Sequence, residues 1–177
     1  TAHTARPPQP STAVEERAAY YRRVRGYMAE PAFRAIVVAH VCHNWGNYVL
    51  LSWLPRYFSS VLGLSWSQLG FAAVVPYVAK LLFSTCWSAV ADWLMAKEHM
   101  SRLAVRKLGM VICFAGPSFF LAIISAGGVG GIGGALACVT MAVGLNGASD
   151  SGFWANIIDV APRQSGEVMG ISNTFGT

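Results

Sequence analysis

The sequence predicts an all-α protein, a polytopic bundle of membrane-spanning helices, and three observations support this fold class. Hydrophobic residues make up 54% of the 177-residue chain and charged residues only 12%, whereas about a quarter of a soluble domain is charged. The apolar residues are collected in long uncharged stretches, and most basic residues lie between those stretches. Such stretches are typical of helices that cross a bilayer.

Residues 35–54 form the most informative of these stretches. They carry no formal charge, Arg34 and Arg56 flank them, and their length is the ~20 residues that a membrane-spanning helix needs. One face of this predicted helix is nevertheless polar. The side chains on that face are His40, His43, Asn44, Asn47 and Tyr48. Polar groups at membrane depth usually face a bundle interior or a wet cavity, so we expect a solute pathway here, with bonding to neighbouring helices as the alternative.

Further apolar stretches predict a bundle of about four complete spans and the start of a fifth. The predicted spans are residues 33–55, 69–91, 107–126, 132–153 and 167 onward, the last of them cut off. Residues 1–30 are predicted to be a basic, disordered linker, in which residues 14–29 can form a short helix on the membrane surface. Pro55 is expected to end the first helix. Because position 1 is not Met and the last span is cut off, we expect the chain to be a piece of a longer protein.

Basic residues alternate between successive connections, as four crossings require. Several Lys and Arg residues precede the first span and occupy residues 92–107, and Arg163 follows the fourth span. Arg56 is alone after the first span, and the glycine-rich turn 126–134 has no charge. Cytoplasmic connections are enriched in Lys and Arg. We therefore expect the N-terminal linker on the cytoplasmic side of the membrane, or on the stromal side in a plastid.

The second predicted span contains one charged residue, Lys80, which shares a helical face with Tyr77. An ammonium group at the bilayer centre costs about 2.5–3.5 kcal/mol on insertion scales, so it needs a partner or an aqueous cavity. We interpret Lys80 as an anion-binding cation in the pathway. The alternative is a lysine that snorkels or pairs with a carboxylate elsewhere.

Charged residues near the span ends predict a conformational lock. Asp92 follows the second span, and Arg106 and Lys107 precede the third, so a carboxylate faces two cations across a predicted loop. Charge-assisted hydrogen bonds between them would hold one state of a moving bundle; ordinary loop charge is the alternative. Asp150 ends the fourth span, where a carboxylate is able to take up a proton or a cation.

Enzymes, metal sites and nucleic-acid binding are poorly supported by the sequence. The four cysteines lie in separate apolar spans without a C-x-x-C pair, and His40 with His43 supplies only two convergent ligands. The glycine-rich turn lacks the G-K-[ST] of a phosphate-binding loop. The segment G-A-S-D at 147–150 lacks the G-x-S-G of membrane serine proteases, and Asp150 and Asp159 lack the contexts of aspartyl ones. Tyrosines among the arginines of residues 14–29 fit a membrane-surface helix better than an RNA-binding one.

Four motifs resemble one transporter family. They are A-H-V-C-H-N-W-G-N-Y-V-L-L-S-W-L-P-R-Y-F at 39–58, A-V-R-K at 104–107, F-A-G-P-S-F-F-L at 114–121 and D-V-A-P-R-Q-S-G-E-V-M-G-I-S-N-T-F-G-T at 159–177. They are similar to the organic-anion and phosphate transporters of the major facilitator superfamily, which include sialin, the vesicular glutamate transporters, the sodium–phosphate cotransporters and the plant plastid anion transporters. The C-H-N-W-G run is most similar to the plant and algal branch.

The resemblance implies a twelve-helix fold, of which this chain supplies the central linker, helices seven to ten and the start of helix eleven. His43 then falls where the vesicular glutamate members have a substrate-contacting arginine, and Asn44 to Gly46 match the surrounding pattern. The positions that correspond to gating loops are Asp92, Arg106, Lys107, Asn156, Asp159, Pro162 and Arg163. The sequence departs from the family at Trp87 and Ser88, where glycines are usual, at Ile157, where histidine is common, and at Lys80, where an apolar residue is usual.

The sequence therefore predicts a secondary active transporter of small anions, phosphate or organic carboxylates, that works by alternating access coupled to Na⁺ or H⁺. The alternative is a non-transporting membrane scaffold or receptor with the same fold. The expected pathway residues are His40, His43, Asn44, Asn47, Tyr48, Tyr77 and Lys80. The expected partners are membrane lipid, a small anion and the N-terminal transporter half, without nucleic acid, metal or another cofactor. A plastid envelope or another organelle membrane is the expected location.

Overall fold

The computed structural model describes residues 12–176, and the elements in that range are all helices. Four long helices form the body: α2 (Pro31–Ser60), α3 (Trp66–Ala96), α4 (Arg102–Ser125) and α5 (Gly131–Asn146). A 3₁₀ turn, η1 (Gly147–Asp150), leads from α5 into α6 (Phe153–Val160). The remaining helices are α1 (Ala13–Ala29) and α7 (Ser165–Gly176). The all-α fold class is confirmed.

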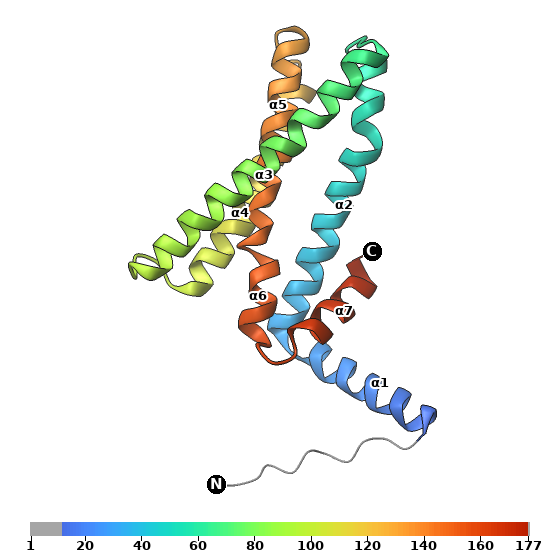
Figure 1. The fold of residues 1–177 in the computed structure, drawn as a ribbon, viewed down its shortest axis with the longest axis vertical. Coiled ribbons are helices and arrows are strands. Elements are labelled where there is room, and N and C mark those ends of the chain that lie inside the picture. Colours follow the sequence, from blue (N-terminus) through green and yellow to red (C-terminus); the bar gives the residue numbers. More distant parts are fainter. Residues whose placement is uncertain (1–11, 177) are drawn as a thin grey trace.

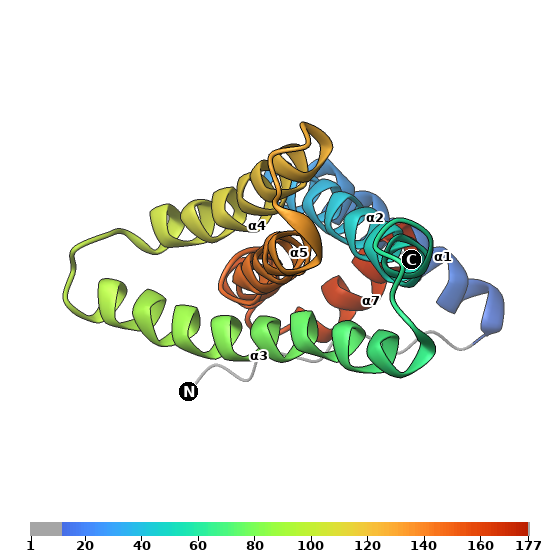
Figure 2. The same ribbon diagram turned by 90° about the horizontal axis from the view of Figure 1, so that it is seen from above.

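The helices run between two ends of an elongated bundle (Figure 1). The α2–α3 and α4–α5 turns lie at one end, while α1 and the α3–α4 and α6–α7 connections lie at the other (Figure 1). Viewed along the bundle, α5 lies between α3 and α4, and α7 lies beside α2 (Figure 2). The segments rich in Lys and Arg thus share one end, as their alternation along the chain predicts; which side of a membrane this end faces stays a prediction.

Three helical stretches of the described chain are long and apolar enough to cross a membrane. They are Trp66–Ala96, Arg102–Ser125 and Gly131–Val160, and only 17%, 17% and 44% of their most apolar windows are buried. Most of this apolar surface must therefore be covered by lipid or by further helices. Helix α2 has 30 residues, which is long enough to span, but its polar face lowers its hydropathy. Its crossing of the membrane stays a prediction.

Side-chain caps and prolines fix where several helices begin. Thr12 and Glu15 form a reciprocal capping box at the start of α1, and Ser65 forms one with Gln68 at the start of α3. The Ser101 side chain accepts a hydrogen bond from the backbone of Ala104 at the start of α4. These contacts satisfy backbone N–H groups that have no partner inside the helix.

The predicted end of the first helix at Pro55 and the predicted loop at residues 92–107 both differ from the structure. Pro55 lies inside α2, which continues to Ser60; the loss of one backbone hydrogen bond is tolerated because Leu54 and Phe58 are buried in a core with α3 and α5. Residues 92–107 are not a loop, since α3 runs to Ala96 and α4 begins at Arg102.

One further span differs from the prediction. The span at 132–153 is broken by η1, after which α6 continues as a separate helix. The short helix predicted at residues 14–29 of the linker is present as α1, and residues 1–11 lie outside the described part of the chain.

Helix α2 is held at both ends by apolar clusters. Near its start, Phe33 and Ile36 pack with Phe153 and Ile157 of α6 and with Val168 of α7. Near its end, Leu54 and Phe58 pack with Ala72 of α3 and with Val139 and Val143 of α5. The polar face of α2 lies between these clusters along the helix. The two cores therefore fix the rotation and height at which α2 presents its polar side chains.

Helix α1 is attached to the start of α7 by a small polar contact. The Arg23 Nε donates to Glu167 Oε1 at 2.6 Å, and the Tyr27 hydroxyl donates to Gln164 Oε1 at 2.7 Å. The hydrogen bond and the charge of Glu167 raise the pKa of Arg23 above its ordinary value. Burial, and then Glu167, raise the pKa of Tyr27, so the tyrosine keeps its donor proton at neutral pH.

We predict that Glu167→Arg releases α1 from α7, because it places a like charge beside Arg23. Backbone amides of α1 should then exchange hydrogen faster, as measured by mass spectrometry. The double variant Arg23→Glu with Glu167→Arg should restore slow exchange. Arg25→Glu is the control, since Arg25 forms no ion pair within the described chain. Equal exchange in Glu167→Arg and the unaltered protein would show that the contact does not hold α1.

Candidate functional site

The centre of the bundle holds a closed ring of polar side chains from three helices. Lys80 of α3 donates through Nζ to Asn47 Oδ1 of α2 at 3.4 Å and to Asn146 Oδ1 of α5 at 3.2 Å. His43 of α2 lies between the other ends of the two amides, with Nε2 2.7 Å from Asn47 Nδ2 and Nδ1 3.5 Å from Asn146 Nδ2. We call Lys80, Asn47, His43 and Asn146 the polar ring.

The ammonium group of Lys80 dictates the hydrogen-bond directions in the ring. It has only donors, so both amides must turn their oxygens toward it and their NH₂ groups toward His43. The 2.7 Å contact then requires an unprotonated Nε2 that accepts from Asn47. A neutral imidazole carries its hydrogen on the other nitrogen, and Nδ1 is 3.4 Å from Cys113 Sγ of α4, which is able to accept it. The ring therefore holds His43 neutral.

Burial divides the ring into a hidden side and an accessible side. His43 and Asn146 are only 4% and 6% exposed, and the His43 ring also contacts the Phe153 ring at 5.3 Å between centroids. Asn47 and Lys80 are partly exposed. The ammonium and one amide are thus the groups that a solute reaches first, while His43 and Asn146 orient them from behind.

A carboxylate lies at the edge of the ring. Asp150 at the end of η1 is exposed, and its Oδ2 accepts a hydrogen bond from Ser84 Oγ, one turn beyond Lys80 on α3. The two segments approach closely at Gly147, where a Cβ atom would lie 2.9 Å from the Lys80 carbonyl oxygen. A side chain at this position would force η1 away from α3. Glycine therefore permits the cation and the carboxylate to share one site.

His40 and Asn44 contact α7 rather than the polar ring, and their role as pathway residues stays a prediction. His40 Nδ1 lies 2.8 Å from Ser172 Oγ, and Asn44 Nδ2 donates to the Gly176 carbonyl oxygen at 2.8 Å. Both partners are in α7, and a Cβ on Gly176 would lie 3.0 Å from the His40 ring. The polar face of α2 is thus divided: His43 and Asn47 face the polar ring, whereas His40 and Asn44 attach α7.

Tyr48 and Tyr77 are not brought into the ring. Their side chains are 48% and 41% exposed, and neither hydroxyl has a hydrogen-bond partner among the described residues. Their role as pathway residues stays a prediction.

The predicted lock between Asp92 and the start of α4 is not formed. Arg106 instead donates through Nε to Asp159 Oδ2 of α6 at 2.7 Å and through Nη1 to the Ser151 carbonyl oxygen at 3.0 Å. The Arg102 Nη1 is 3.5 Å from Asp159 Oδ1. Because Arg106 projects from α4 toward the η1–α6 connection, it points away from the end of α3. Among the described residues, neither Asp92 nor Lys107 forms an ion pair.

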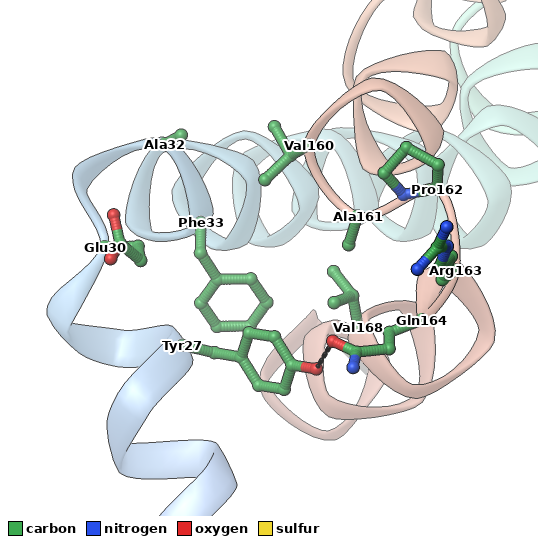
Figure 3. Close-up of a pocket in the computed structure, with 10 residues that line it drawn as sticks. All are labelled: Tyr27, Glu30, Ala32, Phe33, Val160, Ala161, Pro162, Arg163, Gln164 and Val168. Carbon is green, nitrogen blue, oxygen red and sulfur yellow. Dashed lines mark hydrogen bonds between the residues drawn. The ribbon is translucent and has the colours of Figure 1, made fainter. Parts of the chain in front are cut away.

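The remaining predicted gating residues line two cavities at the basic end. Asn156 lines a groove between α2, α4 and α6. Arg163 lines a pocket of about 510 Å³ between the α1–α2 junction and the α6–α7 connection. In this pocket Tyr27 and Phe33 face Val168, with Arg163 and Gln164 along one rim (Figure 3). The polar ring lines neither cavity, so these residues do not contact the site around Lys80.

Several site residues were not predicted from the sequence. Asn146 lies in an otherwise apolar stretch, Cys113 was noted only as one of four cysteines in separate apolar spans, and Ser84 was not assigned a role. A polar residue within an apolar span is the signal that identifies Asn146 and Ser84. No such signal distinguishes Cys113 from the other cysteines. Among the described residues, no group of three or more His, Cys, Asp or Glu is placed to hold a metal ion.

Comparison with known proteins shows to which family this apolar bundle with its polar ring belongs. The Major Facilitator Superfamily profile matches residues 3–177. The chain belongs to the Major Facilitator Superfamily. Among its relatives are the chloroplastic ascorbate transporter of Arabidopsis thaliana, 34% identical over 149 residues, and human sialin, 39% identical over 144 residues. These alignments cover 84% and 81% of this chain, but 27% and 29% of the two relatives.

A third relative is the chloroplastic sodium-dependent phosphate transport protein 1 of Arabidopsis thaliana, 34% identical over 149 residues that make up 84% of this chain and 28% of the relative. The relatives are transporters of the superfamily, as the resemblance implied, and the superfamily is not one of enzymes. The chain spans little more than a quarter of the length of the curated relatives that it matches. It is an all-α, membrane-type part of the superfamily fold.

We predict that His43→Phe destabilises the bundle, because it keeps the aromatic contact with Phe153 but removes both ring nitrogens. Asn47 then loses the acceptor for its NH₂ group, and Cys113 loses the donor at His43 Nδ1, at a cost of about 1–2 kcal/mol by the range of hydrogen bonds measured in membrane proteins. Thermal unfolding in detergent measures the change. His99→Phe, in the exposed α3–α4 connection, is the matched control and should unfold like the unaltered protein. Equal stability of the two variants would contradict the role of His43 in the ring.

Proposed function

We propose that this chain is part of a secondary active transporter of small anions, phosphate or organic carboxylates, that couples their movement to Na⁺ or H⁺ by alternating access. Within the complete transporter it forms part of the C-terminal half, and an N-terminal half closes the site from the other side. The polar ring is the anion site of this half. The linker lies on the cytoplasmic or stromal side.

One observation carries this proposal: Lys80 holds a positive charge in the bundle without a carboxylate in contact. An ammonium group has three donor hydrogens, and two of them go to the neutral amide oxygens of Asn47 and Asn146. The described chain supplies no partner for the third. Burying a charge without an opposite charge in direct contact is unfavourable, so an incoming anion gains a partner, and Lys80 gains a directly bound counter-charge.

The division of the ring fits a role in binding rather than in packing alone. The accessible groups, Lys80 and Asn47, offer N–H donors to an anion once the amide contacts rearrange. The buried groups, His43 and Asn146, keep the donors in position, and preorganised donors bind an anion with little reorganisation. His43 therefore acts through Asn47 rather than as the first contact of the substrate.

The names of the relatives support the proposed substrate class and the proposed location. They name transporters of ascorbate, phosphate and unspecified anions, and several are chloroplastic. Ascorbate and phosphate are small and negatively charged, which matches a site built on one cation. We therefore propose a plastid envelope or another organelle membrane as the location.

The test replaces Lys80 in the full-length transporter reconstituted in liposomes. Uptake of radiolabelled phosphate, ascorbate and a small dicarboxylate is measured with imposed Na⁺ or H⁺ gradients. Lys80→Met should reduce uptake at least tenfold, because loss of one charge-assisted contact is worth about 1.5–3 kcal/mol, whereas Lys80→Arg should keep part of it. Lys97→Met, in the exposed α3–α4 connection, is the control and should transport normally.

Two results would contradict the proposal. Absence of gradient-dependent uptake of any of these anions by the unaltered transporter would favour a scaffold or receptor. Normal uptake by Lys80→Met would show that transport does not use the polar ring.

A further inference from the structure

Asp150 is the one group at the polar ring that neither the packing nor the anion site explains. It is exposed at the end of η1, and its only hydrogen bond from the described chain goes to Oδ2, from Ser84. It forms no ion pair with any described residue. A carboxylate beside an anion site opposes anion binding by repulsion, so its presence there calls for a function.

The geometry places Asp150 close enough to Lys80 for their charges to interact. Ser84 follows Lys80 by one turn of α3, and it binds the Asp150 carboxylate directly. A Cβ atom added to Gly147 of η1 would lie 2.9 Å from the Lys80 carbonyl oxygen and 3.1 Å from Ser84 Cβ, so η1 packs closely against α3 at these two residues. Asp150 accordingly interacts electrostatically with Lys80. The ammonium and the carboxylate are thus two charges of one site, with a serine between them.

The net charge of this pair depends on what is bound. When the site is empty, Lys80 and ionised Asp150 sum to zero. Adding a monovalent anion alone leaves the pair with net charge −1, and adding a proton alone to Asp150 leaves it with +1. Adding both restores zero. Since net charge is costly in a low-dielectric interior, the empty and the doubly loaded states are favoured over either singly loaded state.

We propose that Asp150 is the proton-coupling carboxylate of the anion site, so that one proton is carried with each anion. This inference rests on the proposed function and selects H⁺ over Na⁺ as the coupling ion. The free Oδ1 of Asp150 takes a proton from water on the loading side, and the same O–H bond breaks on the other side. No other bond forms or breaks. By reciprocity, the anion strengthens proton binding by the factor by which the proton strengthens anion binding.

Other titratable and charged groups face Asp150 from the surrounding helices. They are Lys80 on α3, His43 on α2, and Cys113 and Arg106 on α4. Lys80 is a fixed cation, and Arg106 is bound to Asp159 and to the backbone of Ser151. His43 is held neutral by the ring, and Cys113 lies on the buried side of His43. Asp150 is therefore the exposed group that is free to gain a proton.

The first experiment measures proton uptake on anion binding by the purified full-length transporter, with a pH indicator in weak buffer. The probe is ascorbate, which has one negative charge near neutral pH, or phosphate if only phosphate binds. Each bound anion should bring close to one proton into the unaltered protein and almost none into Asp150→Asn. Asp150→Glu should restore uptake. Glu16→Gln, an exposed carboxylate on α1, is the control and should take up protons like the unaltered protein.

The second experiment separates coupling from transport in sodium-free liposomes. Asp150→Asn resembles the protonated state, so its exchange of labelled for unlabelled anion should no longer depend on pH, and it should fail to accumulate anion from a pH gradient. For the unaltered protein, the apparent anion affinity should rise as the pH falls, by up to about tenfold for each pH unit, as one linked proton requires.

The outcomes distinguish this inference from the proposed function. Exchange by the unaltered protein without proton uptake, or accumulation that follows a Na⁺ gradient and ignores pH, would overturn the role of Asp150 while leaving anion transport intact. Persistent pH-driven accumulation by Asp150→Asn would also overturn it. Absence of anion binding and exchange in the unaltered protein would overturn the proposed function itself.

Discussion

The structure depends on one half-buried ammonium group and on how its charge is accommodated. Lys80 lies in a bundle of apolar helices, and its contacts are the oxygens of two amides rather than a carboxylate. This single cation fixes the orientation of both amides, and the amides fix the tautomer of His43. The hydrogen-bond directions throughout the polar ring thus follow from one positive charge. It also follows that the charge remains available to an anion.

The polar ring is held in place by apolar packing on both sides. The cluster around Phe33 and Ile36 joins α2 to α6 and α7, and the cluster around Leu54 and Phe58 joins it to α3 and α5. At the basic end, the Arg106–Asp159 ion pair joins α4 to α6. In the proposed transporter, rigid bodies move relative to a fixed site, and these contacts would make the described helices one such body.

The fold class and part of the site follow from the sequence, because composition, span length and helical periodicity are local properties. His43, Asn47 and Lys80 were predicted from these patterns, and the structure brings them together. The division of the α2 face was not predictable, since it depends on which helices pack against each side of α2. The partner of Arg106 was also missed, because loop proximity favoured Asp92 whereas the direction of α4 favours Asp159.

The account is tested most directly by a cryo-electron microscopy map of the full-length transporter with a transported anion bound. It predicts density for the anion within hydrogen-bonding distance of Lys80 Nζ, with His43 buried behind Asn47 and Asp150 beside the anion. Density at another position, with Lys80 still bound to both amides, would contradict the assignment of the polar ring as the anion site.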